Sequence, residues 1–298
     1  MSKVGFKSGF VTITGRTNVG KSTLLNRMVG QKVVIMSDKP QTTRHKIQSV
    51  LTGEDYQVVF IDTPGIHKPK HKLGERMVET ALKSFREVDI IMLLVEAVMP
   101  GPGDNFVIEQ VKQVLQPVIL VINKIDLVKP ADLPPIIEAF NKLHDFTEII
   151  PVSALSGKNV DRLLQVIVGR LPEGPQYYPD DVVVDRPEKF IMAELIREKV
   201  LHLTSQEVPH SVAVVVENVE QRSENLVAVS AVIYTERESQ KGIIIGKGGR
   251  MLKEVGKLAR EEMETLLGSK IYLELWVKVK KDWRNQDIQM KNFGFTED

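Results

Sequence analysis

The sequence contains no cysteine, which excludes disulfide bridges and thiolate metal sites and is compatible with a reducing cytoplasm. Long hydrophobic runs are also missing: the longest, such as residues 90–95, have strand length, whereas a membrane-spanning helix needs ~20 apolar residues. No secretory signal pattern is visible at the start of the chain. The formal net charge is only +1, which favours no particular partner. These absences predict a cytoplasmic protein.

The length and the position of helix-breaking residues predict two domains. The chain has 298 residues, 42% of them apolar, enough to bury more than one core. Residues 169–180 contain three prolines and two glycines, a composition typical of a linker. We therefore expect a first domain over residues 1–171, a linker over 172–181 and a second domain over 182–298.

The two halves differ in the order of the strands and helices that their hydrophobic patterns predict. Before the linker, apolar strands alternate with helical patterns, which predicts an α/β domain with a mostly parallel sheet. After the linker the predicted order is helix, strand, strand, helix, helix, strand, a smaller α+β domain. Its expected elements cover residues 187–203, 211–216, 226–234, a short helix before Gly246, a long helix to about Leu267, and 271–280. The polar stretch 217–225 is expected to connect the first two strands.

A phosphate-binding motif follows the first strand. Residues 15–22 match GxxxxGK[ST] at every defined position, between an apolar run over 10–14 and a helical segment over 23–29. Such a loop directs backbone N–H groups at an anion. Lys21 can reach the β- and γ-phosphates, and Ser22 can ligate Mg²⁺. The pattern predicts that a nucleoside triphosphate contacts Gly15, Arg16, Thr17, Asn18, Val19, Gly20, Lys21, Ser22 and Thr23.

A second motif specifies the base. Asn123, Lys124 and Asp126 follow the apolar run 117–122, at the end of a predicted central strand where ligands bind in open sheets. The Asp126 carboxylate can accept hydrogen bonds from N1–H and the exocyclic amine of guanine, a pair that adenine does not present. A site built for paired bonds rejects an analogue lacking them. The weaker segment Ser153, Ala154 and Leu155 would back the base, so guanine is predicted.

Two further segments predict a switch that senses the γ-phosphate. Asp62, Thr63, Pro64 and Gly65 form a DxxG motif, in which Asp62 would hold Mg²⁺ through a water and the Gly65 N–H would meet the phosphate. In the polar loop 39–44, Thr43 is favoured as a further Mg²⁺ ligand, with Thr42 as a close alternative. The predicted metal ligands are therefore Ser22, Thr43 and Asp62. The predicted catalytic residues are Lys21, Thr43, Asp62 and Gly65.

Ile66 occupies the position after DxxG, where Ras-type proteins carry the glutamine that orients water. Since isoleucine cannot hydrogen-bond water, we expect slow intrinsic hydrolysis. Asn18 has two interpretations that the sequence leaves open: its side-chain oxygen ligates a monovalent cation such as K⁺, or it merely tolerates a left-handed backbone.

The second domain contains a candidate nucleic-acid loop. Gly246-Lys247-Gly248-Gly249 fits the GxxG loop of a KH module, which clamps about four nucleotides of a single strand. Basic residues then recur at helical spacing, opposite a predicted buried face of Leu252, Val255, Ala259, Met263 and Leu266. Residues 241–260 hold six basic residues and one acidic, whereas residues 181–298 hold eighteen and twenty. The predicted RNA-binding residues are Gly246, Lys247, Gly248, Gly249, Arg250, Lys253, Lys257, Lys280, Lys281 and Arg284.

The cluster at residues 278–284 is ambiguous. Trp283 can stack on a base, but a solvated chain terminus is an equally good interpretation. The second domain as a whole has an alternative role, in which its basic stripe docks on a protein or membrane surface rather than on RNA.

The combination GRTNVGKS, KPQTTR, DTPGIHKP, NKID and IIIGKGGRMLK resembles the bacterial Era GTPase family over essentially the whole chain. The resemblance implies GTP hydrolysis with Mg²⁺ and binding of the 3′ end region of small-subunit ribosomal RNA. It also implies a role in small-subunit assembly and peripheral contact with the cytoplasmic membrane. We expect the protein to be a monomer. Ile66 agrees with this family, whose members lack the catalytic glutamine, and the KH-like domain would be the variant with rearranged strand order.

Overall fold

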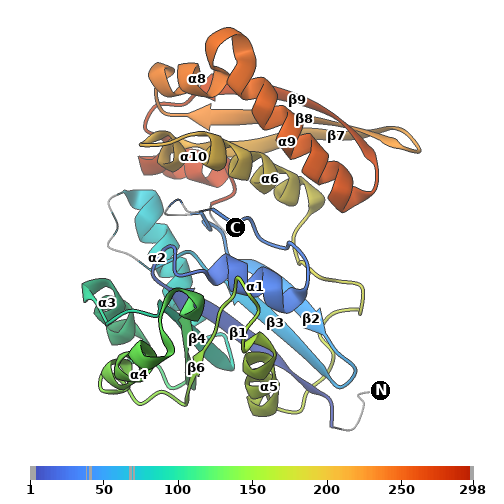
Figure 1. The fold of residues 1–298 in the computed structure, drawn as a ribbon. Coiled ribbons are helices and arrows are strands. Elements are labelled where there is room, and N and C mark those ends of the chain that lie inside the picture. Colours follow the sequence, from blue (N-terminus) through green and yellow to red (C-terminus); the bar gives the residue numbers. More distant parts are fainter. Residues whose placement is uncertain (1–4, 38, 40–41, 67–68, 70, 296–298) are drawn as a thin grey trace. The chain divides into compact units, whose positions relative to one another are not determined.

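The structure, a computed structural model, describes residues 5–37, 39, 42–66, 69 and 71–295. Figure 1 follows the chain from its blue N-terminal part to its red C-terminal part. Most of the chain up to Asp185 forms the first of two compact units, and the second unit begins at Arg186 and also includes Ser37, Thr42 and His71–Leu73. Each unit is described separately below.

The first unit is built on a six-stranded sheet in the order β2-β3-β1-β4-β5-β6. All neighbouring strands are parallel except β2 and β3, which are antiparallel. This confirms the predicted α/β fold with a mostly parallel sheet. The strands are β1 (Lys7–Gly15), β2 (Ile47–Thr52), β3 (Tyr56–Asp62), β4 (Ile90–Glu96), β5 (Val118–Asn123) and β6 (Glu148–Pro151).

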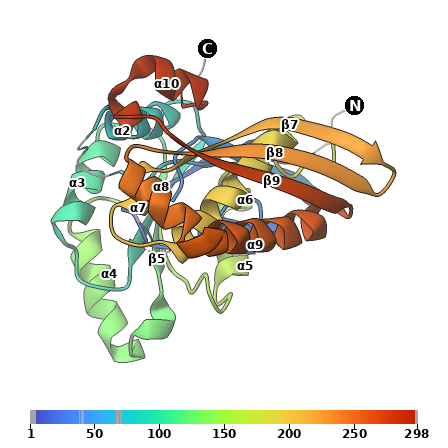
Figure 2. The same ribbon diagram turned by 90° about the horizontal axis from the view of Figure 1, so that it is seen from above.

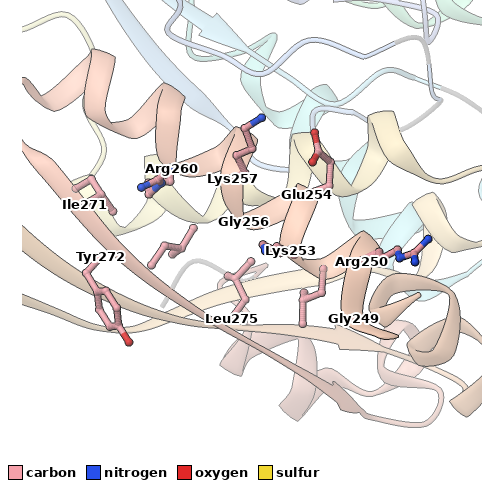
Figure 3. Close-up of a pocket in the computed structure, with 12 residues that line it drawn as sticks. Gly249, Arg250, Lys253, Glu254, Gly256, Lys257, Arg260, Ile271, Tyr272 and Leu275 are labelled. Carbon is pink, nitrogen blue, oxygen red and sulfur yellow. The ribbon is translucent and has the colours of Figure 1, made fainter. Parts of the chain in front are cut away.

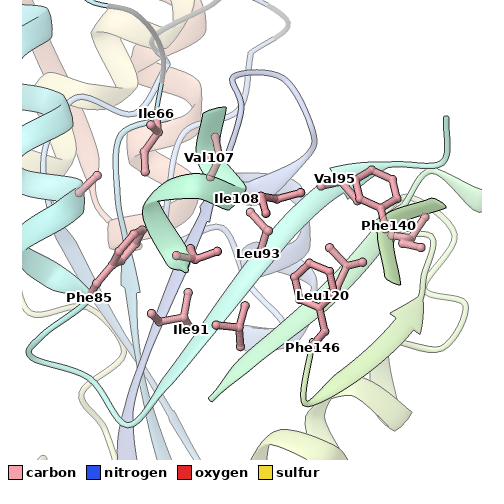
Figure 4. Packing of buried hydrophobic residues seen from close by; sticks show 14 of the residues in the cluster. Ile66, Phe85, Ile91, Leu93, Val95, Val107, Ile108, Leu120, Phe140 and Phe146 are labelled. Atoms are coloured by element: carbon pink, nitrogen blue, oxygen red, sulfur yellow. The ribbon is translucent and has the colours of Figure 1, made fainter. Parts of the chain in front are cut away.

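Helices cover both faces of this sheet, which explains why its strands are continuous apolar runs rather than alternating ones. On one face, Ile91, Leu93 and Val95 of β4 pack into a buried cluster that includes Phe85, Ile108 and Phe140 (Figure 4). The intervening β4 residues point to the opposite face and are equally buried. The helices are α1 (Lys21–Val29), α2 (Lys72–Ser84), α3 (Pro102–Val111), α4 (Leu133–Asn141) and α5 (Val160–Arg170), with short 3₁₀ turns η1 (Ile125–Leu127) and η2 (Pro130–Asp132).

The predicted linker, residues 172–181, is held against this sheet. The Gln57 side chain donates to the Tyr178 carbonyl at 2.8 Å and accepts from the N–H groups of Tyr177 and Tyr178 at 2.8 and 2.9 Å. Slightly further on, the Val50 N–H donates to the Val183 carbonyl at 2.8 Å. The segment up to Asp185 is therefore an ordered strap on the first unit, despite its loop-like composition.

The second unit has a three-stranded sheet in the order β7-β8-β9. β7 and β8 are antiparallel, while β8 and β9 are parallel. Helices α6 and α9 pack on one face of it (Figure 2). The elements are α6 (Glu188–Leu203), α7 (Val208–Ser211), β7 (Ala213–Ser223), β8 (Leu226–Thr235), α8 (Glu238–Ile245), η3 (Lys247–Gly249), α9 (Arg250–Leu267), β9 (Lys270–Val279), η4 (Trp283–Asn285) and α10 (Asp287–Asn292). This order confirms the predicted α+β domain.

Two local expectations in the second unit are wrong. The stretch 217–225 is mostly strand, because β7 continues to Ser223 and the connection shrinks to a tight turn. Its polar composition reflects exposure rather than a loop. Leu266 is 46% exposed instead of buried, because it lies in the last turn of α9, beside only the first turns of α6. Val255, Ala259 and Met263 are buried as predicted.

No helix within the described residues is both long enough and apolar enough to cross a membrane.

Candidate nucleotide and nucleic-acid sites

The phosphate loop runs from the end of β1 to the start of α1 and depends on two glycines. Gly15 and Gly20 have φ values of 141° and 99°. A Cβ on Gly15 would lie 2.3 Å from the Leu94 carbonyl oxygen, and one on Gly20 would lie 2.3 Å from Nδ2 of Asn123. Only glycine fits these positions, and the resulting turn leads directly into the N-terminus of α1. Asn18 also has a positive φ, 66°.

Lys21 is buried beneath this loop. Its Nζ donates to the carbonyls of Gly15 at 3.1 Å and Arg16 at 2.7 Å. Burial lowers the pKa of Lys21 to about 8, an effect that the nearby Asp62 carboxylate partly opposes. Burial likewise raises the pKa of Asp62 to about 6, although Lys21 and hydrogen bonds from Thr43 and Thr63 oppose this rise. One Asp62 oxygen, Oδ1, is buried with no hydrogen-bond partner in the described part of the chain.

Three oxygen-bearing side chains converge beside Lys21. The Ser22 Oγ lies 3.3 Å from the Thr43 Oγ1, and the Thr43 hydroxyl donates to Oδ2 of Asp62 at 3.1 Å. The Thr42 hydroxyl instead donates to the Lys39 carbonyl of its own loop at 2.7 Å. The structure therefore brings together the favoured set Ser22, Thr43 and Asp62 and leaves Thr42 outside it. Hydroxyl and carboxylate oxygens are suitable Mg²⁺ ligands, and the unpartnered Asp62 Oδ1 fits a site for a hydrated cation. Residues 40 and 41 of the same loop lie outside the described residues.

The DxxG segment crosses close to the phosphate loop. The Thr63 hydroxyl donates to the Ile13 carbonyl at 3.0 Å, so this residue anchors the segment to β1. At Gly65, a Cβ would lie about 3.1 Å from both the Thr17 nitrogen and the Lys21 Nζ. Ile66 N–H donates to the Gly15 carbonyl at 3.3 Å, while its side chain points into the buried cluster of Figure 4. Residues 67 and 68 of the quoted motif lie outside the described residues.

The base motif is organised by Asn123. Its Nδ2 donates to the Val19 carbonyl at 2.8 Å, and its Oδ1 accepts from the Ala154 N–H at 2.9 Å. Both ends of this amide therefore bind backbone and join the phosphate loop to the loop that begins at Ser153. Asp126 lies in η1 with its side chain exposed, while Ser153 and Ala154 are buried and Leu155 is exposed. The Asp126 carboxylate, the group predicted to bind guanine through paired hydrogen bonds, is therefore accessible to a ligand.

Three residues outside the sequence motifs, Arg27, Asp104 and Glu96, support these loops. Arg27 of α1 donates from Nε to the Ala154 carbonyl at 3.2 Å and from its terminal nitrogen to the Leu155 carbonyl. Arg16 donates to Oδ1 of the buried Asp104 at 2.7 Å, and Lys124 forms an ion pair with Glu96. The partners are 28 to 128 positions apart, so local sequence patterns carry no signal for them.

The GxxG loop in the second unit is open on its outer side. Gly246, Gly248 and Gly249 have φ values of 69°, 61° and 77°. A Cβ on Gly246 would lie 2.7 Å from the Cβ of Met251, which explains the need for glycine where α8 meets α9. At Gly248 and Gly249 a Cβ would meet nothing within 4 Å. A ligand can therefore approach the backbone closely at these two residues.

A groove of about 840 Å³ begins at this loop and runs between α9 and β9. Figure 3 shows Arg250, Lys253 and Arg260 along α9 on one side of it, and Ile271 and Leu275 on the strand. Gly256 allows close approach of helix and strand, since a Cβ there would contact the Leu275 side chain at 3.4 Å. Four basic residues and one acidic residue, Glu254, line the groove, so its rim is mainly cationic and its floor apolar, as in sites for single-stranded nucleic acid.

The C-terminal cluster is different from either sequence interpretation. Trp283 is fully buried, and its indole N–H donates to the Ser211 carbonyl at 2.8 Å. It is neither a stacking surface nor part of a solvated terminus, because the turn η4 inserts it into the core of the second unit. Arg284 forms an ion pair with Glu236 at 2.5 Å, whereas Lys280 and Lys281 are exposed.

The fold and these sites define a P-loop NTPase domain of the guanine-specific type followed by a KH domain. Residues 10–124 match the family described as 50S ribosome-binding GTPase, and residues 207–284 match the KH domain family. The structure is similar to a variant of Era from Aquifex aeolicus bound to GDP and AlF4⁻. The two share 43% sequence identity and a TM-score of 0.95, over 98% of this chain and 100% of that chain. The same values hold for Era in complex with MgGDPNP and nucleotides 1506–1542 of 16S ribosomal RNA. The chain therefore belongs to the Era family of GTPases.

Proposed function

We propose that this protein is a GTP-hydrolysing switch that binds single-stranded RNA from the 3′ end region of small-subunit ribosomal RNA and acts in assembly of that subunit. The convergence of Ser22, Thr43 and Asp62 beside the buried Lys21 supports this function most directly. A metal ion and a terminal phosphate bound here would hold the loop that carries Thr43, which would link its conformation to the nucleotide.

Each residue has a defined task in this proposal. Mg²⁺, when bound, neutralises negative charge that develops on the phosphates. Ser22, Thr43 and Asp62 would hold it, Lys21 would contact the phosphates, and the Gly65 N–H would meet the terminal one. Asp126 would select guanine. Because the Ile66 side chain points into the core, no side chain at that position orients water, and we expect slow intrinsic turnover.

Similarity supports ribosomal RNA of the small subunit as the target. The full-length relative was solved with 16S ribosomal RNA, and its 43% identity covers both domains of this chain. The 50S description applies to a family match that covers residues 10–124 alone and excludes the KH domain. We therefore assign the RNA specificity to the second unit and to the small subunit.

The alternative is that the second domain docks on a protein or membrane surface. The groove favours RNA, because its cations line a narrow channel next to backbone that is open at Gly248 and Gly249. A docking surface for a folded protein would more often be broad and apolar at its centre.

The decisive experiment is a titration of small-subunit ribosomal RNA 3′ fragments against the protein loaded with a GTP analogue or with GDP. We expect affinity for a fragment from this region to differ between the two nucleotide states, and an unrelated single strand to bind more weakly. Absence of binding to every fragment in both states would contradict the RNA assignment and favour the docking alternative.

Two finer assignments belong to the same proposal. Asn18 would ligate K⁺ near the phosphates, so GTP turnover is expected to be faster in potassium than in sodium, and equal rates would exclude this role.

The second assignment is a cytoplasmic monomer that contacts the membrane only peripherally. Such a protein would co-sediment with anionic vesicles in a salt-dependent way. Retention on vesicles at high salt would contradict a purely electrostatic contact.

A further inference from the structure

The outer face of β9 carries two exposed aromatic rings. Tyr272 and Trp276 of this strand are 47% and 62% exposed. The odd-numbered residues of the strand, whose side chains point to the opposite face, are buried or half-buried. Successive side chains of a strand point to opposite faces, so both rings lie on the face away from α9. Figure 3 shows the Tyr272 ring pointing away from the helix. Tyrosine and tryptophan are enriched at binding surfaces, where one part of the side chain is apolar and another can form hydrogen bonds.

Tyr272 is paired with a cation from two strands away. The guanidinium carbon of Arg222 on β7 lies 5.2 Å from the centre of the Tyr272 ring. On the middle strand β8, the residue paired with Tyr272 is Ala228. Its side chain is small, so the longer Arg222 side chain can extend across β8 to the Tyr272 ring. Aromatic rings and guanidinium planes are the two surfaces on which proteins stack unpaired bases.

The open part of this face is limited. Towards the other end of the sheet the rings of Tyr234 and Phe293 lie 4.6 Å apart, and Phe293 contacts the buried Trp283. The C-terminal segment therefore covers that end. The aromatic surface that stays exposed is confined to Tyr272 and Trp276.

The charges on the same face are balanced internally. Lys278 lies 3.7 Å from Glu217, and Glu274 accepts from the Tyr272 hydroxyl at 3.2 Å and pairs with Ser230 at 3.3 Å. Arg222 lies 4.0 Å from Glu220. The cations Lys278 and Arg222 thus each have a carboxylate partner, so we expect them to attract phosphates only weakly. A ligand on this face would be held through its bases.

This face adjoins the groove across a single strand. β9 is an edge strand of its sheet. Its residues Ile271, Leu273 and Leu275 line the groove, and Tyr272 borders it as well, although its ring points away from the helix in Figure 3. Trp276 lies on the same face of the strand as Tyr272. A nucleic acid that fills the groove and continues past β9 reaches these rings without crossing another element.

We propose that Tyr272, Trp276 and Arg222 form a second RNA subsite, in which bases leaving the groove stack on the outer face of β9. This inference rests on the proposed RNA-binding function and adds to it a binding surface outside the GxxG groove. The groove holds the backbone through charge and open amides, and the second subsite holds bases through stacking.

Intrinsic fluorescence tests this directly, because the chain has two tryptophans and Trp283 is fully buried. The probes are an oligonucleotide of about four nucleotides, which matches a KH groove, and one of about twelve from the same ribosomal RNA end. We expect the long RNA to quench Trp276 and the short RNA to leave it unchanged. The variant Trp276→Leu is expected to bind the long RNA about tenfold more weakly, in the range found for removal of one stacking partner. It should bind the short RNA within twofold of the original protein.

Control experiments distinguish a failure of the second subsite from a failure of the proposed RNA-binding function. Trp276→Phe keeps an aromatic face and is expected to restore long-RNA affinity. The salt dependence of binding should be the same for Trp276→Leu as for the original protein, since no phosphate contact is lost. Gly248→Asp reports on the groove alone: if it abolishes binding while Trp276→Leu changes nothing, the second subsite is wrong and the proposed function stands.

Other outcomes overturn the proposal in different ways. Equal weakening of short and long RNA by Trp276→Leu would mean that the residue supports the groove or the fold. If Trp276→Leu abolishes self-association in sedimentation and leaves RNA binding intact, the face is a contact between copies of this chain. If neither RNA binds the original protein, the RNA-binding function itself fails.

Discussion

At the scale of single residues, the nucleotide site is defined by two buried charges of opposite sign. Burial moves the pKa of Lys21 down to about 8 and that of Asp62 up to about 6, so both charged forms are disfavoured by their surroundings. A phosphate group near Lys21 and a divalent cation near Asp62 would stabilise those charged forms. The site is thus arranged so that its ligands compensate for its burial.

These pKa values predict the pH dependence of nucleotide binding. Below about pH 6 Asp62 takes up a proton and loses its negative charge, and above about pH 8 Lys21 loses its positive charge. Mg²⁺-dependent affinity for a GTP analogue should therefore be highest between these values and fall up to about tenfold per unit below pH 6. Titration with a fluorescent analogue from pH 5 to 9 measures it. In Asp62→Asn the loss of affinity below pH 6 should disappear. If affinity still falls below pH 6 in this variant, another group is responsible for that pH dependence.

Asp126 provides a second test at this scale. Asp126→Asn should shift preference from guanine to xanthine nucleotides, because xanthine carries a carbonyl where guanine carries its amine. A loss of GDP affinity of at least a hundredfold, with XDP bound more tightly than GDP, is expected from competition assays. Asp132→Asn, an exposed aspartate on the neighbouring η2 turn, is the matched control and should change neither affinity. Unaltered GDP preference in Asp126→Asn would remove it from the base site.

At the scale of elements, long-range contacts hold the loops that carry these residues. α3 contributes Asp104, which accepts the Gly101 N–H at 2.9 Å and the Arg16 guanidinium at 2.7 Å. This buried carboxylate joins the start of α3 to the phosphate loop. Without it, Arg16 would keep only its longer ion pair with Glu96, at 3.9 Å, and the phosphate loop would lose its hydrogen bond to α3.

Asp104→Asn should accordingly weaken GDP affinity about tenfold while the protein still folds, since the amide keeps the size and one acceptor oxygen. Calorimetry gives the affinity and a thermal melt gives the stability. The control is Glu109→Gln on the same helix, where an exposed carboxylate pairs with Lys112 at the surface. Equal loss of affinity in both variants would show a general charge effect rather than a loop effect.

The GxxG loop supports an element-scale prediction for RNA. Gly248 has φ 61° with open space around it, and Asp and Asn tolerate this backbone conformation better than other residues. Gly248→Asp should abolish RNA binding by repelling phosphate, whereas Gly248→Asn, which has the same shape without the charge, should lose less than the aspartate variant. Filter binding at two salt concentrations measures both. Equal losses would indicate that side-chain size, not charge, closes the loop.

At the scale of the whole molecule, the strap that ends at Asp185 belongs to the first compact unit. The strap covers Gln57 and the edge of β2 and satisfies their hydrogen bonds. Removing it would leave several polar groups of the sheet without partners.

A fragment ending at Asp185 should therefore fold and bind GDP as the full chain does. One ending at Leu171 should be less stable by about 3 kcal/mol, from three or more lost hydrogen bonds of about 1 kcal/mol each. This corresponds to a melting temperature lower by about 6–12 °C for a domain of this size. Indistinguishable melting of the two fragments would show that the strap does not contribute to the first unit.

The sequence by itself determined the class of both units and predicted the main site residues. Glycine-dependent turns such as Gly15–Ser22 and Gly246–Gly249 have a local backbone geometry that few sequences can adopt, so their patterns are specific. The tertiary structure alone decided that Asn123 binds backbone at both ends, that Thr43 rather than Thr42 joins Ser22 and Asp62, and that Trp283 is a core residue. Arg27, Glu96, Asp104 and the aromatic face of β9 likewise became visible only in three dimensions. Contacts between residues far apart in the chain depend on how elements pack, and packing has no local sequence pattern.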